Sequence, residues 1–428
     1  LAVTSHLLSL AVFIPPSGWT DDRFGARNVF RIAMAVFMAG SLVCAASESL
    51  SMFVAGRIIQ GAGSAMMTPV GRLLLLRSVD KKSLVDAMAW LTVPALIGPV
   101  VGPPLGGFIT TYATWHWIFL INIPVGVTGI ILATRYIPDV RTEMLDPIDL
   151  TGLIYSGIAV AGLAFGLSVA GLDVIPTSMT LSLLIMGTIG AVAYRRHAAR
   201  TAAPALDFSL LAVSTFRANL IGGSMFRLGV GAMPFLLPLL MQLGFGLTPF
   251  ESGMVTFASA AGSLIMKTVA AKVLRRFGFR PVLVFNALIS ACFIAACALF
   301  RPDTPIAVII IVLLVGGFFR SLEFTSVNTI AYADIDPEHM SRATTLVSVG
   351  QQLSVSAGVA LGAFIVDIGQ RMSPTQSITA ADFAPAFLVI AAISASSALV
   401  FRRLPADAAA HLSGRVAPTP GNPEKPVA

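Results

Sequence analysis

Long apolar stretches recur along the whole chain and are separated by short polar connections. Each stretch is 17 to 25 residues long, the length that an α-helix needs to cross about 30 Å of hydrocarbon. The pattern predicts an all-α polytopic membrane protein with thirteen spans. Their expected bounds are 1–17, 30–47, 52–71, 87–110, 117–134, 150–170, 177–194, 218–241, 252–271, 281–300, 306–330, 344–366 and 383–401.

The composition excludes a water-soluble protein. Of the 428 residues, 56% are hydrophobic and 11% are charged, whereas soluble domains carry roughly 25% charged residues. The three cysteines lie inside apolar stretches, without the spacing of a disulfide framework or a metal site. The five histidines are scattered, and none pairs with a cysteine or carboxylate at ligand spacing. We therefore expect no enzyme, no metal and no cofactor.

Basic residues indicate the orientation in the membrane. Of the 28 lysines and arginines, 22 fall on alternate connections, Arg72 and Arg77 among them, and only Arg301 and Arg371 fall on the opposite set. Cytoplasmic loops are rich in Lys and Arg, so this bias places the C-terminus in the cytoplasm. The net charge of +7 is thus a property of these loops, and no nucleic-acid partner is expected. The Pro- and Ala-rich tail 404–428 is expected to be disordered.

A short motif occurs twice. Residues 23–29 and 276–282 both read R-F-G-x-R-x-V, and they lie 253 residues apart on predicted cytoplasmic connections. Two tight hairpins that each need a glycine turn and flanking arginines are one explanation. The other is a repeated helical bundle, an architecture typical of secondary transporters, which hold their substrate between the two repeats.

The first copy belongs to a longer pattern. Gly18, Asp22, Arg23, Gly25 and Arg27 resemble the signature G-x-L-A-D-R-x-G-R-K of the major facilitator superfamily, although Thr20, Asp21 and Ala26 depart from it. Asp22 lies at a helix end and can pair with an arginine or a helix N-terminus. The resemblance implies a latch that holds the cytoplasmic side closed. A hairpin that only sets topology remains the alternative.

Two further motifs support the resemblance. Residues 57–63, including Arg57 and Gln60, match the superfamily's R-x-x-Q-G-x-G pattern, which implies a role in proton coupling. A structural arginine satisfied by backbone carbonyls is the alternative. Residues 98–107 resemble the antiporter motif G-x-x-x-G-P-x-x-G-G, carried here by Gly98, Gly102, Pro103, Gly106 and Gly107. Close packing of small residues, without a role in antiport, would also explain that pattern.

The segment 115–126, W-H-W-I-F-L-I-N-I-P-V-G, is similar to one in the fourteen-helix drug:proton antiporters of the EmrB/QacA type, with His116 in place of the usual arginine. The resemblance implies the major facilitator fold, two pseudo-symmetric six-helix bundles with two linker helices between them. The expected parts are an N-terminal bundle at 1–137, linker helices at 146–197 and a C-terminal bundle at 217–403. Thirteen of fourteen spans are then present, and a first helix preceding residue 1 is expected to be missing.

Charges inside predicted spans are the candidates for proton coupling, because a membrane charge is costly and normally faces a cavity or partner. They include Arg227, Arg320 and Glu323, and also Lys267, which can snorkel to the cytoplasmic face. Glu323 is the only carboxylate clearly inside a span, so it is the best candidate for protonation. Arg320 and Glu323 lie three residues apart and can instead neutralise each other.

The chain lacks a Walker-type ATP-binding loop, so an ion gradient is the expected energy source. We expect a proton-coupled antiporter in the bacterial cytoplasmic membrane that exports amphiphilic drugs or toxic metabolites by alternating access. Its partners would be protons, these substrates and the lipid bilayer, and an outer-membrane export partner stays open. The alternatives are a uniporter or symporter for one metabolite, or a non-transporting sensor or partner subunit.

Overall fold

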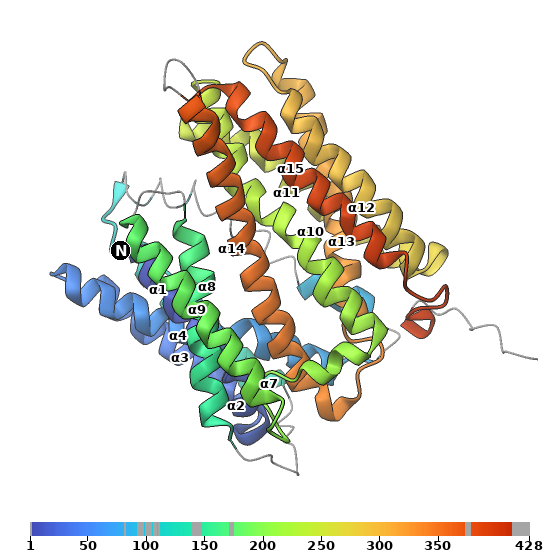
Figure 1. Cartoon of the computed structure of the whole chain (residues 1–428). Helices are drawn as coiled ribbons and strands as arrows, with labels where there is room; N and C mark the ends of the chain where they lie inside the picture. Colours follow the sequence, from blue (N-terminus) through green and yellow to red (C-terminus); the bar gives the residue numbers. More distant parts are fainter. Residues whose placement is uncertain are drawn as a thin grey trace, which may run out of the picture.

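The computed structural model describes residues 2–80, 83–91, 98, 105, 109, 112–137, 148–170, 175–372 and 378–412. Throughout these residues the regular secondary structure is helical (Figure 1). Apolar stretches of this length favour helices in a membrane, because a helix satisfies its own backbone hydrogen bonds.

The helices before residue 138 are called here the N-terminal group. They are α1 (Ala2–Phe13), α2 (Ser17–Phe24), α3 (Ala26–Ala45), α4 (Leu50–Ser78), α6 (Trp117–Leu120) and α7 (Asn122–Tyr136). Helices α3 and α4 pack closely because Gly40, Gly56 and Gly63 lie against the neighbouring backbone, where a side chain would clash.

Two helices follow the N-terminal group, α8 (Leu150–Val169) and α9 (Thr177–Ala198). They pack on each other through Gly162 and Gly187, whose backbones meet directly. The Asp149 side chain accepts a hydrogen bond from the Gly152 amide and thereby caps α8. The same carboxylate lies 2.7 Å from Nε2 of His197 near the end of α9, so one contact fixes both helices at that end.

The helices from residue 214 onward are called the C-terminal group. They are α10 (Ser214–Leu239), α11 (Pro249–Phe277), α12 (Phe279–Ala296), α13 (Ile306–Ile330), α14 (Met340–Met372) and α15 (Ala380–Phe401). The chain also has short 3₁₀ turns (η2, Phe208–Ala212; η4, Cys297–Leu299; η5, Pro337–His339; η6, Ala410–Leu412) and a π-helical turn (η3, Leu240–Gly244). Residues 84–91, in the N-terminal group, are helical as well. Two capping boxes begin α11 and α15, at Thr248 and Thr379.

Ten helices among the described residues are long and apolar enough to cross a membrane. They correspond to ten of the thirteen predicted spans. The predicted span 1–17 falls on α1, which has only 12 residues, and the predicted span 87–110 lies largely outside the described residues. The remaining span falls on α4, which is long enough, but its arginines, glycines and Gln60 lower its hydropathy. The count of thirteen spans thus stays a prediction.

Two sequence predictions differ from the structure at element ends. Helix α4 continues to Ser78, past the predicted end at residue 71, so Arg72 belongs to a buried helix and not to a cytoplasmic connection. The tail is also ordered further than expected. Leu404, Ala408 and Leu412 are buried against the core, and His411 Nε2 lies 3.1 Å from the Ala333 carbonyl oxygen.

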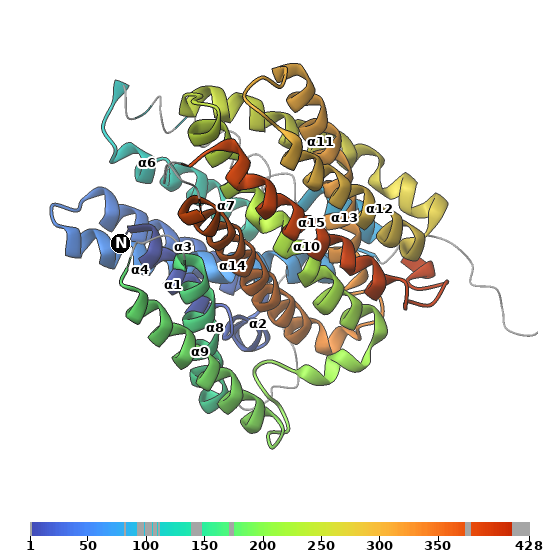
Figure 2. The ribbon, with the colours of Figure 1, turned by 45° about the horizontal axis from the view of Figure 1, so that its top comes forward.

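The C-terminal group meets the rest of the molecule along α14, which lies between α8 and α10 in both views (Figures 1 and 2). At its first turns α14 also packs on α2. The Ser341 hydroxyl donates a hydrogen bond to the Gly18 carbonyl oxygen, at 2.8 Å, and the Ser17 and Thr345 hydroxyl oxygens are 3.3 Å apart. Under the predicted orientation, this contact closes the cytoplasmic side.

Candidate functional site

The five residues of the predicted latch lie together where α2 turns into α3. Gly25 has φ 81° and ψ 132°, a conformation that strongly favours glycine. Asp22 forms an ion pair with Arg77 of α4 at 3.1 Å, Arg27 donates to the Ile137 carbonyl oxygen at 3.2 Å, and Arg23 is exposed. These charged contacts lie within the N-terminal group, whereas Gly18 makes the contact with α14.

Asp21 is a second carboxyl in this corner. It is fully buried, and neither of its carboxyl oxygens has a hydrogen-bond partner among the described residues. Burial raises the pKa of the Asp21 carboxyl well above its usual range, the neighbouring Asp22 charge adds to this, and the positive charge of Arg77 acts in the opposite direction. The site therefore favours the protonated form of Asp21.

Arg57 and Gln60 begin a polar stripe on α4. The Arg57 guanidinium donates to Oε1 of Gln60 at 2.6 Å, and Nε2 of Gln60 donates to the Ser41 hydroxyl oxygen of α3 at 2.8 Å. The Asn122 amide of α7 reaches the same hydroxyl oxygen at 3.2 Å. Arg57 Cζ also lies 6.0 Å from the centre of the Phe119 ring. Three helices thus share one polar network.

The antiporter motif falls mostly outside the described residues, which include only Gly98 of its five positions. Among the described residues, nothing lies within 4 Å of the position that a Gly98 Cβ would occupy. In the following segment, Trp115 stacks on His116 with ring centres 3.9 Å apart and meets Phe53 edge to face. These rings join the N-terminal end of α6 to α4.

A polar seam joins α11 to α13. Three residues at every fourth position of α11 bond with residues of α13. Their contacts are Ser259 with Arg320, Ser263 with Gly317 and Ser321, and Lys267 with Thr325 at 2.6 Å. Gly262 and Gly317 allow the close approach, since a Cβ at either position would clash with the opposite backbone. Lys267 is buried in this seam and does not reach an exposed position.

Glu323 faces the other neighbour of α13. It is fully buried, and one carboxyl oxygen accepts a hydrogen bond from Nδ2 of Asn286 on α12 at 3.0 Å. The other oxygen has no partner among the described residues. No ion pair joins Glu323 to Arg320 in the part of the chain that the structure describes, because Arg320 turns towards Ser259. An isolated buried carboxyl is costly to ionise, so this site suits a group that binds and releases a proton.

A cavity of about 10 Å³ lies one helical turn from Glu323. Ser290, four residues after Asn286, and Arg320, three residues before Glu323, line it together with apolar side chains. A cavity of this size holds about one water molecule when polar groups line it. The Ser290 hydroxyl is buried and has no partner among the described residues, so it is available to such a molecule.

Arg227 and Arg72 lie where the two groups meet. Arg227 of α10 donates to Oδ1 of Asn328 on α13 at 3.0 Å. Arg72 of α4 donates to the Tyr332 hydroxyl oxygen at 3.2 Å and to Oε1 of Gln351 on α14 at 3.4 Å. Asn328 and Tyr332, the partners of the two arginines, are four residues apart. The contacts of Arg72 hold α4 against the C-terminal group.

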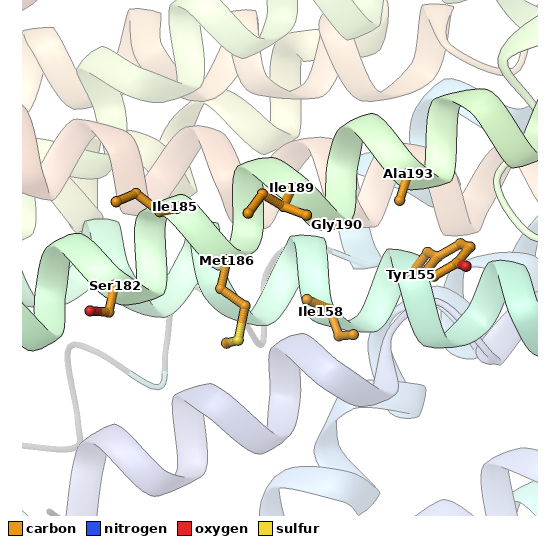
Figure 3. A pocket seen from close by; sticks show the side chains of 8 residues that line it. All are labelled: Tyr155, Ile158, Ser182, Ile185, Met186, Ile189, Gly190 and Ala193. Carbon is orange, nitrogen blue, oxygen red and sulfur yellow. The ribbon is translucent and has the colours of Figure 1, made fainter.

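A second hollow, between α8 and α9, has a different character. It has a volume of about 400 Å³ and is lined by residues of α8 and α9, among them Tyr155, Ile158, Met186 and Ile189 (Figure 3). No charged side chain lines it, and Met186 and Ile189 are exposed. An open apolar groove on a membrane helix pair suits contact with lipid tails.

The described residues contain no cluster of three or more His, Cys, Asp or Glu side chains that could hold a metal ion.

Residues 1–195 and 220–425 match the family model described as Major Facilitator Superfamily. The chain belongs to this superfamily. Two bacterial relatives bear the name multidrug resistance protein MdtD. The chain is 36% identical over 407 residues to that of Pectobacterium carotovorum subsp. carotovorum, covering 95% of this chain and 87% of the relative. It is 37% identical over 409 residues to that of Yersinia enterocolitica, with the same coverage of 95% and 87%. The chain is thus similar over most of its length to relatives that bear this name.

Solved structures of the superfamily share the fold. The human organic anion transporter MFSD10 (TETRAN) superposes with a TM-score of 0.69 at 14% identity, covering 94% of this chain and 83% of that one. The proton:xylose symporter XylE superposes with a TM-score of 0.63 at 14% identity, covering 93% and 84%. At this identity the likeness concerns the fold alone.

Several residues of these sites have no clear signal in the sequence. Asn286, Tyr332 and Gln351 are neutral polar residues whose partners lie on other helices. Arg72 carries a signal, but the positive-inside rule assigns it to a loop. The sequence identifies Asp21 as a departure from the superfamily signature, but it does not predict that Asp21 is buried.

Proposed function

We propose that the chain is a proton-coupled antiporter that exports amphiphilic drugs or toxic metabolites by alternating access. It acts in the cytoplasmic membrane, with the C-terminus in the cytoplasm, and the proton gradient is its energy source in place of a cofactor. The membership in the superfamily and the MdtD-type relatives support the transport of small molecules.

The observation that carries proton coupling is the environment of Glu323. Its carboxyl is buried, holds one hydrogen bond from Asn286 and has no cationic partner among the described residues. Its proton-bound form is neutral and fits that environment, whereas the ionised form needs water or a cation. A change of conformation that alters access to Glu323 would therefore change its proton occupancy, which is the coupling that antiport requires.

The contact between the groups supports alternating access. Its polar part includes hydrogen bonds and small side chains, such as Gly18 against Ser341 and Thr345, and the exposed ion pair between Arg275 and Asp86. Hydrogen bonds and ion pairs of this kind can break and form again, although apolar residues of both groups also share one buried core. The two groups can then rock about the buried charges between them.

Transport into proteoliposomes tests the proposal. The purified chain is reconstituted, and uptake of two amphiphilic dyes, cationic ethidium and anionic N-dansyl-phenylalanine, is followed with an acidic lumen or with equal pH. We expect at least one dye to accumulate in the acidic lumen and to leave when a protonophore collapses the gradient. Protein-free liposomes report passive partitioning.

Glu323→Gln is the decisive variant, because it keeps the shape and the Asn286 contact but cannot exchange a proton. We expect its gradient-driven uptake to fall by about a hundredfold or more, which is the range found for the loss of one proton-transfer group. Glu338→Gln, which changes an exposed carboxylate, is the matched control. Uptake that ignores the gradient would indicate a uniporter, and movement with the protons a symporter.

A further inference from the structure

The surroundings of Arg227 are unusual for a buried cation. Its side chain is 1% exposed and lies in the middle of α10, where Gly223 leaves room for the guanidinium. One nitrogen donates to Asn328. The other two, Nε and Nη1, are buried and have no hydrogen-bond partner among the described residues.

A second cation approaches from the other helix group. Arg72 is 6% exposed, and its two contacts, with Tyr332 and Gln351, are both neutral. Among the described residues, neither Arg72 nor Arg227 takes part in an ion pair. Tyr332 follows Asn328, the partner of Arg227, by four residues. The two buried guanidinium groups therefore lie near each other, and no carboxylate among the described residues pairs with either of them.

Three other cations at or near the core leave fewer buried nitrogens without a partner than Arg227 does. Lys267 donates to Thr325, Arg320 donates to Ser259, and Arg77 pairs with Asp22. A buried guanidinium with unused donors costs free energy, and repulsion from a second guanidinium adds to that cost. Both costs fall if an anion binds between them, and the fork of a guanidinium matches a carboxylate through two parallel hydrogen bonds.

We propose that Arg227 and Arg72 form a binding subsite for the carboxylate of an amphiphilic substrate. This proposal rests on the proposed export function and names the chemical class of its substrate. Arg227 supplies two free donors from the C-terminal group, and Arg72 supplies charge from the N-terminal group. Because the two arginines belong to different groups, the substrate would hold both groups together, and their separation would weaken its binding.

Binding of a matched pair of probes tests the subsite. The purified chain is placed in nanodiscs of zwitterionic phosphatidylcholine and titrated with N-dansyl-phenylalanine and with N-dansyl-phenylalaninamide, followed by dansyl fluorescence. The two probes share their apolar body and differ only in carboxylate against amide. We expect the carboxylate to bind about tenfold tighter or more, as for a charge-assisted pair of hydrogen bonds. Equal affinity for the two probes overturns the proposal.

Substitutions of the two arginines test whether they cause the preference for the carboxylate probe. Arg227→Gln should remove the preference for the carboxylate and keep the affinity for the amide, and Arg72→Gln should reduce the preference. Arg217→Gln, on the exposed surface of the same helix, should change neither affinity. A preference that survives in Arg227→Gln contradicts the proposal. If that variant does not fold, Arg227→Lys and Arg72→Gln decide, and an unchanged preference in both contradicts it.

The outcome is separable from that of the proposed function. Gradient-driven export of ethidium alone, without preference for the carboxylate probe, would remove the subsite and leave proton antiport standing. Carboxylate binding that depends on Arg227, in a chain whose transport ignores the pH gradient, would retain the subsite and remove proton antiport.

Discussion

The two R-F-G-x-R-x-V hairpins have nearly the same backbone and different chemistry. In the first, α2 turns into α3 at Gly25, and in the second, α11 turns into α12 at Gly278. Both glycines have φ 81°, and both turns are closed by the glycine amide, which donates to the carbonyl oxygen four residues earlier, that of Asp21 or of Leu274. The repeat thus extends from the sequence to the conformation.

The side chains before the two glycines differ. Asp21 and Leu274 occupy equivalent positions, and both are fully buried. The next position holds Asp22 in the first hairpin and Arg275 in the second, so the sign of the charge is reversed. Asp22 pairs with Arg77 inside its own group, whereas Arg275 pairs with Asp86 of the N-terminal group.

The same backbone turn therefore occurs in two different chemical environments. The second hairpin buries an apolar side chain and makes an exposed ion pair, so it behaves as a structural turn. The first buries a carboxyl beside the contact with α14, where Gly18 meets Ser341 and Thr345. Protonation can therefore influence the first hairpin and the contact of the two groups, but not the second.

The largest expected effect comes from making the second hairpin like the first. Leu274→Asp places a carboxyl in an apolar core without a partner, so we expect a loss of about 3 kcal/mol in the free energy of unfolding. Denaturant titration in mixed micelles measures it. Leu274→Met, which nearly conserves the volume, should cost less than about 1.5 kcal/mol. If the Leu274→Asp variant were as stable as the wild type, position 274 would accept a buried carboxyl as position 21 does, and the proposed difference between the two hairpins would be wrong.

The glycines should respond alike. Gly25→Ala and Gly278→Ala each force a side chain into a conformation that favours glycine, at a cost of about 1–3 kcal/mol. Gly71→Ala and Gly253→Ala are matched controls on α4 and α11, where an added Cβ meets nothing closer than 3.5 Å. These should leave the melting temperature unchanged or raised. A tolerated Gly278→Ala beside a disruptive Gly25→Ala would show that the two turns do not share their backbone constraint.

Asp21 should give the first hairpin a pH dependence. Its pKa is raised in the folded chain, so the fold loses stability as pH rises from the ordinary value of about 4 towards the raised value. Asp21→Asn removes this loss and should stabilise the chain by about 1 kcal/mol at pH 7, with no difference below about pH 4. Thermal unfolding against pH measures it, with the exposed Asp80→Asn as control. If the difference in stability between Asp21→Asn and the wild type were the same at all pH values, Asp21 would not be the source of the pH dependence.

The ion pairs should show the smallest effects. The Asp22–Arg77 side chains are 24% and 18% exposed, and those of Asp86 and Arg275 are 49% and 54% exposed. We expect Asp22→Asn to cost about 1 kcal/mol and Asp86→Asn less than about 0.5 kcal/mol, because solvent and salt screen the exposed pair. Unfolding at low and high salt compares them. If Asp86→Asn lost more free energy of unfolding than Asp22→Asn, the ion pair of the second hairpin would be the stronger of the two, which contradicts this expectation.

Local pattern predicted the helices well and their contacts poorly. The predicted span 306–330 coincides with α13, because a long apolar stretch determines its own helix. The end of α4 was predicted seven residues early, since Arg72 has the charge of a loop residue and the packing that buries it comes from α14.

The candidate site depends even more on tertiary contacts. Arg320 and Glu323 lie on one helix, and their spacing allows an ion pair. They bond instead to Ser259 of α11 and to Asn286 of α12. The partners of the two side chains depend on which helices lie on either side of α13. The spacing of residues within α13 cannot predict them. Glu323 was identifiable from the sequence as a carboxylate in a span, but its amide partner was not.

Proton-driven uptake by wild-type and Glu323→Gln proteoliposomes tests the central claim most directly. The account predicts that dye accumulates in an acidic lumen with the wild type and with Glu338→Gln, and that Glu323→Gln loses this accumulation while remaining folded. Full gradient-driven accumulation by Glu323→Gln would contradict the account.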